Sequence, residues 1–144
     1  MKLIKLILML CLFSNLANAK DSSMKLKISF EDKTVIVALA NNSVTEQLVT
    51  MLPKNFEFTD FAGEEKITEF PKSVDLTKAP RRMIARAGKM FSYVPWGNLG
   101  IFYKNHSFFP DNNLLEIGEV ESGLEYLANH KGGFKARLEI ITGE

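Results

Sequence analysis

Residues 89–103 read KMFSYVPWGNLGIFY, with a short apolar segment on each side of Val94-Pro95-Trp96-Gly97. Both segments are rich in aromatic and aliphatic side chains and have the length of β-strands. Pro at the second position of a turn presets φ, and Gly is favoured at the fourth position. The stretch therefore predicts two strands joined by a type I turn.

Short segments of the same kind lie on both sides of this turn. They are MKLKISF (24–30), TVIVALA (34–40), FEFTDF (56–61), EKITEF (65–70) and FKARLEII (134–141). Several alternate apolar and polar residues, the period of a half-buried strand, and Gly, Pro or Asn separate them. About seven or eight short strands predict a mainly β fold. Closure into a barrel would remove the exposed edges that an open sheet leaves.

Two short helices are predicted from capping-box spacing. Ser43 and Glu46 stand three residues apart ahead of an apolar i, i+4, i+7, i+8 stripe, and we expect this helix to run to Pro53. Ser122 and Glu125 repeat the spacing ahead of a second apolar face. The fold class expected is therefore a β-barrel with two small helices.

The first 19 residues have the three regions of a secretory signal peptide. Two lysines precede an apolar run over residues 6–13, and Ala17-Asn18-Ala19 forms a small-x-small cleavage triplet. The run is too short for a membrane anchor, and Cys11 lacks the small preceding residue of a lipoprotein signal. We expect cleavage after Ala19, a periplasmic or secreted protein, and one domain over residues 20–144.

Composition argues against several classes of function. Residues 1–19 hold two Lys and no acid, so the 18 basic and 17 acidic residues become 16 and 17, a net charge of −1. That balance does not predict a nucleic-acid or anionic-membrane partner. His106 and His130 stand alone, without the spacing of a metal site. Motifs of nucleophilic hydrolases, nucleotide enzymes and dinucleotide cofactors are also missing. We expect a fold without metal, cofactor or disulfide.

Three stretches spread over the chain carry a family resemblance. They are FTDFAGEEKITEFP (58–71), AGKMFSYVPWGNLGIFYK (87–104) and IGEVESGLEYL (117–127). Together they resemble the bacterial and archaeal cyclophilin-like family, and the resemblance extends from about Met24 to the C-terminus. It implies a closed eight-stranded barrel whose ends are covered by two helices. No segment reproduces the Phe-Met-x-Gln-Gly-Gly-Asp stretch that prolyl isomerases with this fold carry beside a catalytic Arg, so the resemblance does not imply that activity.

Trp96 is the first candidate for a binding residue. Turns lie at the surface, and the proline and glycine of this turn already satisfy its backbone, so the indole must be explained by what it covers. One interpretation is a lid that folds back on the barrel end. The other is a wall of an apolar cleft shared with Tyr93 and Phe102, with Asn98 as hydrogen-bond donor and acceptor.

Two more segments complete the predicted site. Phe61 and Glu64 lie in the corner FAGE, while the adjacent Glu64-Glu65 pair also fits a solvated strand face. Arg86 lies in the basic, loop-like segment APRRMIARAG (79–88), which is either a solvated loop or the source of a guanidinium. The predicted ligand-binding residues are Phe61, Glu64, Arg86, Tyr93, Trp96, Asn98 and Phe102.

The predicted function is binding of a peptide or small ligand by an exported domain, with no catalytic residue assigned. The alternative is a weak peptidyl-prolyl cis-trans isomerase that would take its guanidinium from Arg81, Arg82 or Arg86. Interaction with another protein through a sheet edge is a third hypothesis, which no particular residue favours.

Overall fold

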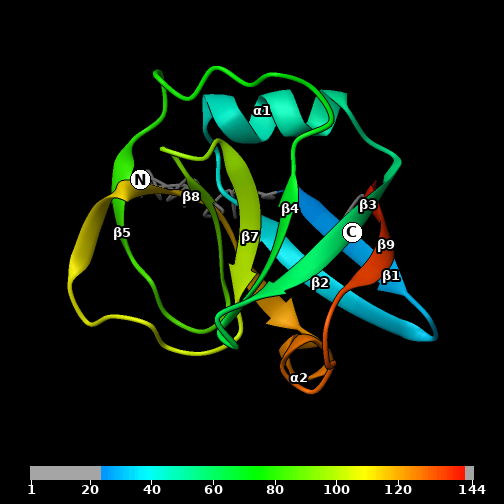
Figure 1. The fold of residues 1–144 in the computed structure, drawn as a ribbon. Helices are drawn as coiled ribbons and strands as arrows, with labels where there is room; N and C mark the ends of the chain where they lie inside the picture. The colour runs from blue at the N-terminus through cyan, green and yellow to red at the C-terminus, as the bar shows by residue number, and fades with distance from the viewer. Residues whose placement is uncertain (1–23, 142–144) are drawn as a thin grey trace, which may run out of the picture.

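The computed structural model describes residues 24–141, so the predicted signal peptide and its cleavage site lie outside the described residues. This part of the chain forms nine strands and two helices (Figure 1). The strands are β1 (Lys25–Phe30), β2 (Lys33–Leu39), β3 (Lys54–Phe61), β4 (Glu65–Glu69), β5 (Arg81–Ile84), β6 (Lys89–Tyr93), β7 (Asn98–Phe102), β8 (Pro110–Ser122) and β9 (Phe134–Ile141). The helices are α1 (Ser43–Thr50) and α2 (Leu124–Ala128). None of the described helices is both long enough and apolar enough to cross a membrane.

Eight of the strands form a closed antiparallel barrel. Their order is β2-β1-β9-β3-β4-β7-β6-β8, and β8 pairs with β2 to complete the ring. The ninth strand, β5, pairs only with the first part of β8 and extends to one side (Figure 1). The predicted mainly β fold with an eight-stranded barrel is confirmed.

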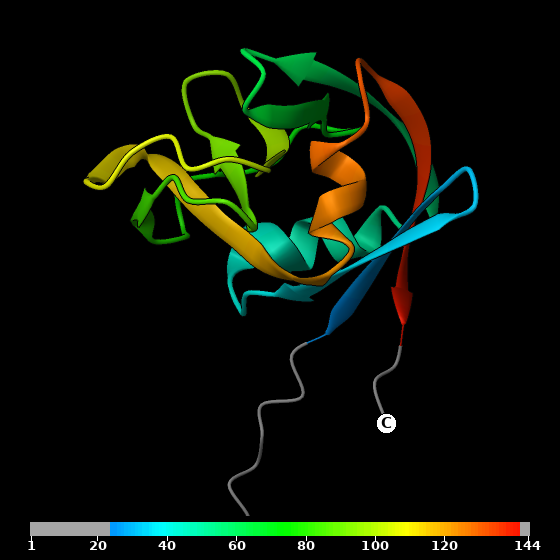
Figure 2. The ribbon, with the colours of Figure 1, turned by 90° about the horizontal axis from the view of Figure 1, so that it is seen from below.

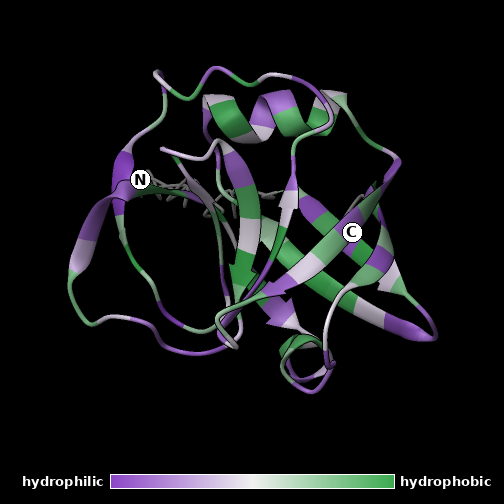
Figure 3. Ribbon diagram, in the orientation of Figure 1, coloured by the Kyte–Doolittle hydropathy of each residue, from purple (hydrophilic) through white to green (hydrophobic). Residues whose placement is uncertain are grey.

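The two helices lie at opposite ends of the barrel. Figure 1 places α1 at the top and α2 at the bottom, and in the view from below in Figure 2 α2 lies in front of α1. Val44 and Leu48 of α1 and Leu127 of α2 are fully buried in the same apolar core as the inward side chains of the strands. Apolar and polar residues alternate along the strands (Figure 3), as half-buried strands require.

The helix N-termini differ from the prediction. The N-cap of α1 is Asn42, whose Oδ1 accepts the N–H groups of Val44 and Thr45 at 3.0 Å each, and α1 ends at Thr50. The capping box was wrong because an amide one residue earlier already satisfies these donors. The second box was wrong because Ser122 is the last residue of β8, and α2 follows Gly123 without a side-chain cap.

Two strands were missed from the sequence. Residues 81–84 were interpreted as loop, but they form β5 and pair with β8. The 13-residue β8 reads PDNNLLEIGEVES, which contains Pro, Asp, Asn, Gly and Glu, all depleted in strands. It forms because β5, β6 and β2 all pair with it, and pairing overrides its weak intrinsic preference.

Candidate functional site

A hollow lies on the outer face of the barrel beside the β6–β7 turn. We call it the aromatic cleft, and its volume is about 270 Å³. Met90 and Ile101 point into the barrel core, so the alternate residues Phe91 and Phe102 point outward and join a second apolar cluster. The cleft is lined by Phe61, Ala62, Glu64, Glu65, Phe91, Tyr93, Trp96, Phe102, His106, Asp111 and Leu114.

The floor of the aromatic cleft is a pair of stacked rings. Phe91 and Phe102 lie on neighbouring strands with their centroids 4.2 Å apart and their planes at 23°. Gly100 makes room for this packing, because a Cβ there would lie 2.5 Å from Cζ of Phe91. Both phenylalanines are buried, so the floor is rigid and dry where it meets the barrel.

The wall of the aromatic cleft is the predicted turn. The N–H of Gly97 donates to the carbonyl oxygen of Val94 at 3.2 Å, and Gly97 has a φ of +59°. Trp96 is 57 % exposed, which is incompatible with a place in the core. Its ring is nearly perpendicular to that of Phe61 at 5.4 Å and to that of Tyr93 at 5.2 Å.

Five of the seven predicted ligand-binding residues therefore come together at this cleft: Phe61, Glu64, Tyr93, Trp96 and Phe102. The structure does not bring Asn98 and Arg86 to it. Asn98 is buried, and its Oδ1 accepts the N–H of Tyr93 at 3.0 Å, which closes the base of the turn. Arg86 is exposed in the connection between β5 and β6, beyond the strand that the prediction treated as loop.

Three acidic side chains and one histidine form the polar rim of the cleft, and of these four residues the sequence assigned only Glu64 to the site. Glu64 pairs with Nδ1 of His106 at 2.5 Å. Glu65 is half-buried, not on a solvated strand face, and burial raises its pKa to about 7 although the nearby His106 opposes the rise. Asp111 comes from β8, the strand that was not predicted. No sequence pattern links Glu64 and Glu65 with His106 and Asp111, so only the fold could show that they meet at the rim.

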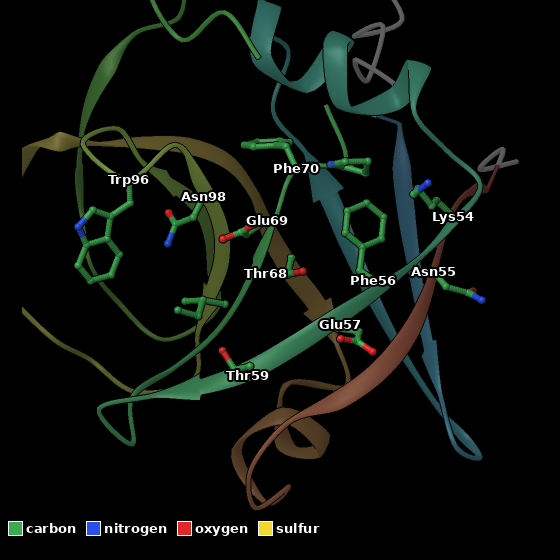
Figure 4. Close-up of a pocket in the computed structure, with 12 residues that line it drawn as sticks. Lys54, Asn55, Phe56, Glu57, Thr59, Thr68, Glu69, Phe70, Trp96 and Asn98 are labelled. Carbon is green, nitrogen blue, oxygen red and sulfur yellow. The ribbon is translucent and has the colours of Figure 1, made fainter. Parts of the chain in front are cut away.

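A second hollow of about 590 Å³ begins on the other side of Trp96 (Figure 4). Strands β3 and β4 pair only over Thr59–Phe61 and Glu65–Ile67 and diverge beyond, so the hollow opens between them. Figure 4 shows Thr68, Glu69 and Asn98 on one side and Phe56 and residues of β3 on the other. Trp96 borders both hollows.

Metal ligation has no geometric support in residues 24–141, where no three His, Cys, Asp or Glu side chains are grouped to hold an ion.

Comparison with known proteins agrees with this architecture. The solution structure of a hypothetical protein from Archaeoglobus fulgidus superposes with a TM-score of 0.66 at 17 % sequence identity, covering 82 % of this chain and 95 % of the other. At that identity the likeness shows the fold alone. No curated protein matches the chain in sequence. The model of the Cyclophilin-like family matches residues 28–139, which is most of the chain and nearly all of the barrel. The chain therefore belongs to the cyclophilin-like family.

Proposed function

We propose that the protein is an exported binding protein whose aromatic cleft takes a peptide or a small ligand. The observation that carries the proposal is the exposure of Trp96 between Phe61 and Tyr93 at the mouth of a cavity. The turn needs only its proline and glycine, so the indole has no backbone role, and it contributes little to the core. Large aromatic side chains at the edge of a concave surface are typical of binding sites.

The size of the aromatic cleft limits what it takes. About 270 Å³ is slightly below the range of about 300–1,000 Å³ that is usual for ligand pockets, so we expect one amino-acid side chain or a small molecule to enter it. The stacked floor of Phe91 and Phe102 offers apolar contact, and the acidic rim offers hydrogen-bond acceptors. A peptide longer than one residue would continue over Trp96 toward the hollow between β3 and β4.

Intrinsic fluorescence tests the proposal directly, because Trp96 is the single tryptophan of the chain. The probes are the neutral apolar dye N-phenyl-1-naphthylamine and a series of acetyl-Ala-X-Pro-Ala amides with X varied. We expect a saturable change in Trp96 emission with at least one probe. Tyr93→Ala should abolish the change, whereas Tyr126→Ala on α2, outside the cleft lining, should preserve it. If no probe gives a saturable change, the proposal is wrong.

Prolyl isomerisation is the second candidate. The activity must lower a barrier of about 18–20 kcal/mol, and a charged donor near the amide is the usual device. Among the described residues lining the aromatic cleft there is no Arg or Lys, and Arg86 lies elsewhere. We therefore expect no rate above the uncatalysed one in a protease-coupled assay on an X-Pro peptide. Robust catalysis that disappears in Arg86→Ala, with the fold intact, would reverse this ranking.

Export is the other part of the proposal, and the three regions of residues 1–19 support it. Intact-mass measurement of protein recovered from its native compartment should find a chain that begins at Lys20. A mass that includes Met1, or an acylated Cys11, would contradict the proposal.

A further inference from the structure

The aromatic cleft carries more negative than positive charge. Glu64, Glu65 and Asp111 all line it, and its lining in the described chain contains no Lys or Arg. The His106 imidazole pairs with Glu64. No Lys, Arg or His of residues 24–141 makes an ion pair with Glu65 or with Asp111, so two carboxylates at the cleft lack a cationic partner.

Glu65 lies at the edge of the aromatic floor. It stands directly opposite Phe102 in the pairing of β4 with β7, and the His106 ring lies over Phe102 at 6.2 Å. Glu65 is half-buried, so its ionisation costs solvation, which the nearby His106 offsets only in part because that imidazole pairs with Glu64. A positively charged ligand beside Glu65 would restore that loss.

The three exposed or half-exposed rings of the cleft suit the same ligand charge. Trp96 meets Phe61 at 84° and Tyr93 at 86°, so the rings form an angular wall. The faces of such rings carry partial negative charge and attract a cation within about 6 Å of their centroids. Trp has the strongest such attraction, and here it is the most exposed of the three.

We propose that the aromatic cleft recognises an alkylated ammonium group, with Phe61, Tyr93 and Trp96 around its methyl groups and Glu65 as its counter-charge. This inference rests on the proposed function and names the chemistry of the ligand. An anion would meet three carboxylates. A neutral apolar group would contact the three aromatic rings but leave the Glu65 carboxylate without a charged partner. A methylated ammonium has both the apolar surface and the charge, and it fits a cavity of about 270 Å³.

The charge of Glu65 makes recognition depend on pH. Glu65 is faced by Glu64 and Asp60, which disfavour its ionisation, and by His106, which favours it, while Asp111 lines the same cleft. The cation binds the ionised carboxylate, so affinity should rise between pH 6 and pH 8. In Glu65→Gln that rise should be reduced, which assigns it to the Glu65 carboxylate.

The test compares choline with 3,3-dimethylbutan-1-ol, which has the same shape without the charge, by titration of Trp96 emission at pH 8. We expect choline to bind about tenfold more tightly than the alcohol. Glu65→Gln should weaken choline binding about tenfold and leave binding of the alcohol unchanged, which also shows that the variant is folded. Glu125→Gln on α2 is the matched control and should behave as the natural sequence.

The outcomes separate this inference from the proposed function. Equal binding of choline and the alcohol would overturn the cation preference while the binding function stands. If choline, the alcohol and acetyl-Ala-trimethyllysine-Ala amide all fail to bind, the cation proposal is wrong. The neutral probes of the proposed function then test the binding function independently. Tighter binding of the trimethyllysine peptide than of choline would assign the cation to a modified protein side chain. The reverse order would assign it to a free small molecule, and both orders support the proposal.

Discussion

Nζ of Lys66 donates a hydrogen bond to the backbone carbonyl oxygen of His130 at 2.6 Å, which ties β4 to the segment after α2. The same ammonium contacts the carbonyl oxygen of Gly132 at 2.8 Å and Oδ1 of Asp60 at 3.0 Å. Its side chain is fully buried. The three protons of the ammonium thus have three oxygen partners, which is the condition under which a buried charge is tolerated.

Lys66→Ala should lower the free energy of unfolding by about 3 kcal/mol. The change leaves two carbonyl oxygens and the Asp60 carboxylate without their shared donor at that end of the barrel. Urea denaturation followed by circular dichroism measures the loss. Lys135→Ala is the matched control, because Lys135 pairs with Glu57 at a place where both side chains are largely exposed. The free energy of unfolding of this control variant should hardly change. Equal effects of the two variants would contradict the role given to Lys66.

Trp96→Ala should cost less than about 1 kcal/mol of folding stability, although tryptophan is the largest side chain. Trp96 is 57 % exposed, and its removal opens the aromatic cleft to water without forming an internal cavity. Phe91→Ala, at the buried floor of the same cleft, should cost about 3–5 kcal/mol. Both values come from urea denaturation followed by circular dichroism. A loss from Trp96→Ala as large as that from Phe91→Ala would place the indole in the core.

The part of the free energy of unfolding that depends on Glu65 should fall as the pH rises from about 4.5 to about 7. Burial raises the pKa of Glu65 in the folded state to about 7 from its ordinary value of 4.5. Between these values the folded state holds a proton that the unfolded state has released, so raising the pH favours unfolding. The stabilisation that protonated Glu65 gives the folded state is therefore fully present below pH 4.5 and is lost as the pH rises through about 7.

Glu65→Gln isolates this contribution. Relative to the natural sequence, the variant should gain free energy of unfolding as the pH rises from 4.5 to 8. Urea denaturation at each pH measures this difference. Glu125→Gln, on the exposed side of α2, should show no such shift. A difference that stays constant with pH would mean that Glu65 ionises normally in the folded protein.

Gly118→Ala should destabilise the barrel by about 1–3 kcal/mol. Gly118 lies where β8 pairs with β2 and closes the ring. A Cβ at this position would lie 2.5 Å from the carbonyl oxygen of Ala38, which belongs to the backbone and cannot rotate away. Asn112→Ala, at an exposed position of the same strand, is the control, with little expected change in the urea midpoint. An unchanged midpoint for Gly118→Ala would show that β2 and β8 have room to separate.

Much of the barrel could be predicted from local patterns. β1 and β9 alternate apolar and polar residues, and β2 combines β-branched residues with a tight turn before it. These strands needed no distant information, because a period of two and turn residues are local properties. The exposure of Trp96 was predictable for the same reason, since Pro95 and Gly97 define the turn that carries it.

The site was only partly predictable, because its rim is assembled from distant segments. His106 and Asp111 reach the aromatic cleft through the β7–β8 connection and the start of β8. The strand β8 has a composition that disfavours strands, and its three partner strands stabilise it in the folded state. Arg86, which sequence proximity placed beside the aromatic strands, is exposed in the connection between β5 and β6 and is not among the residues that line the cleft.

Strand alternation in the sequence shows which residues of β4 share a face, but tertiary contacts set which of the two faces lies inside the barrel. Glu65 and Ile67 alternate with Lys66 and Thr68, and hydrophobicity alone would direct Ile67 to the core. In the folded protein Lys66 and Thr68 are buried, while Ile67 packs outward against the cluster beneath the aromatic cleft. The reason is that oxygen atoms from Asp60 and from the segment after α2 meet the Lys66 ammonium inside the barrel. Two of the three oxygen partners, those of His130 and Gly132, lie 64 and 66 residues away in the sequence, so no local pattern could indicate that they would compensate a buried charge.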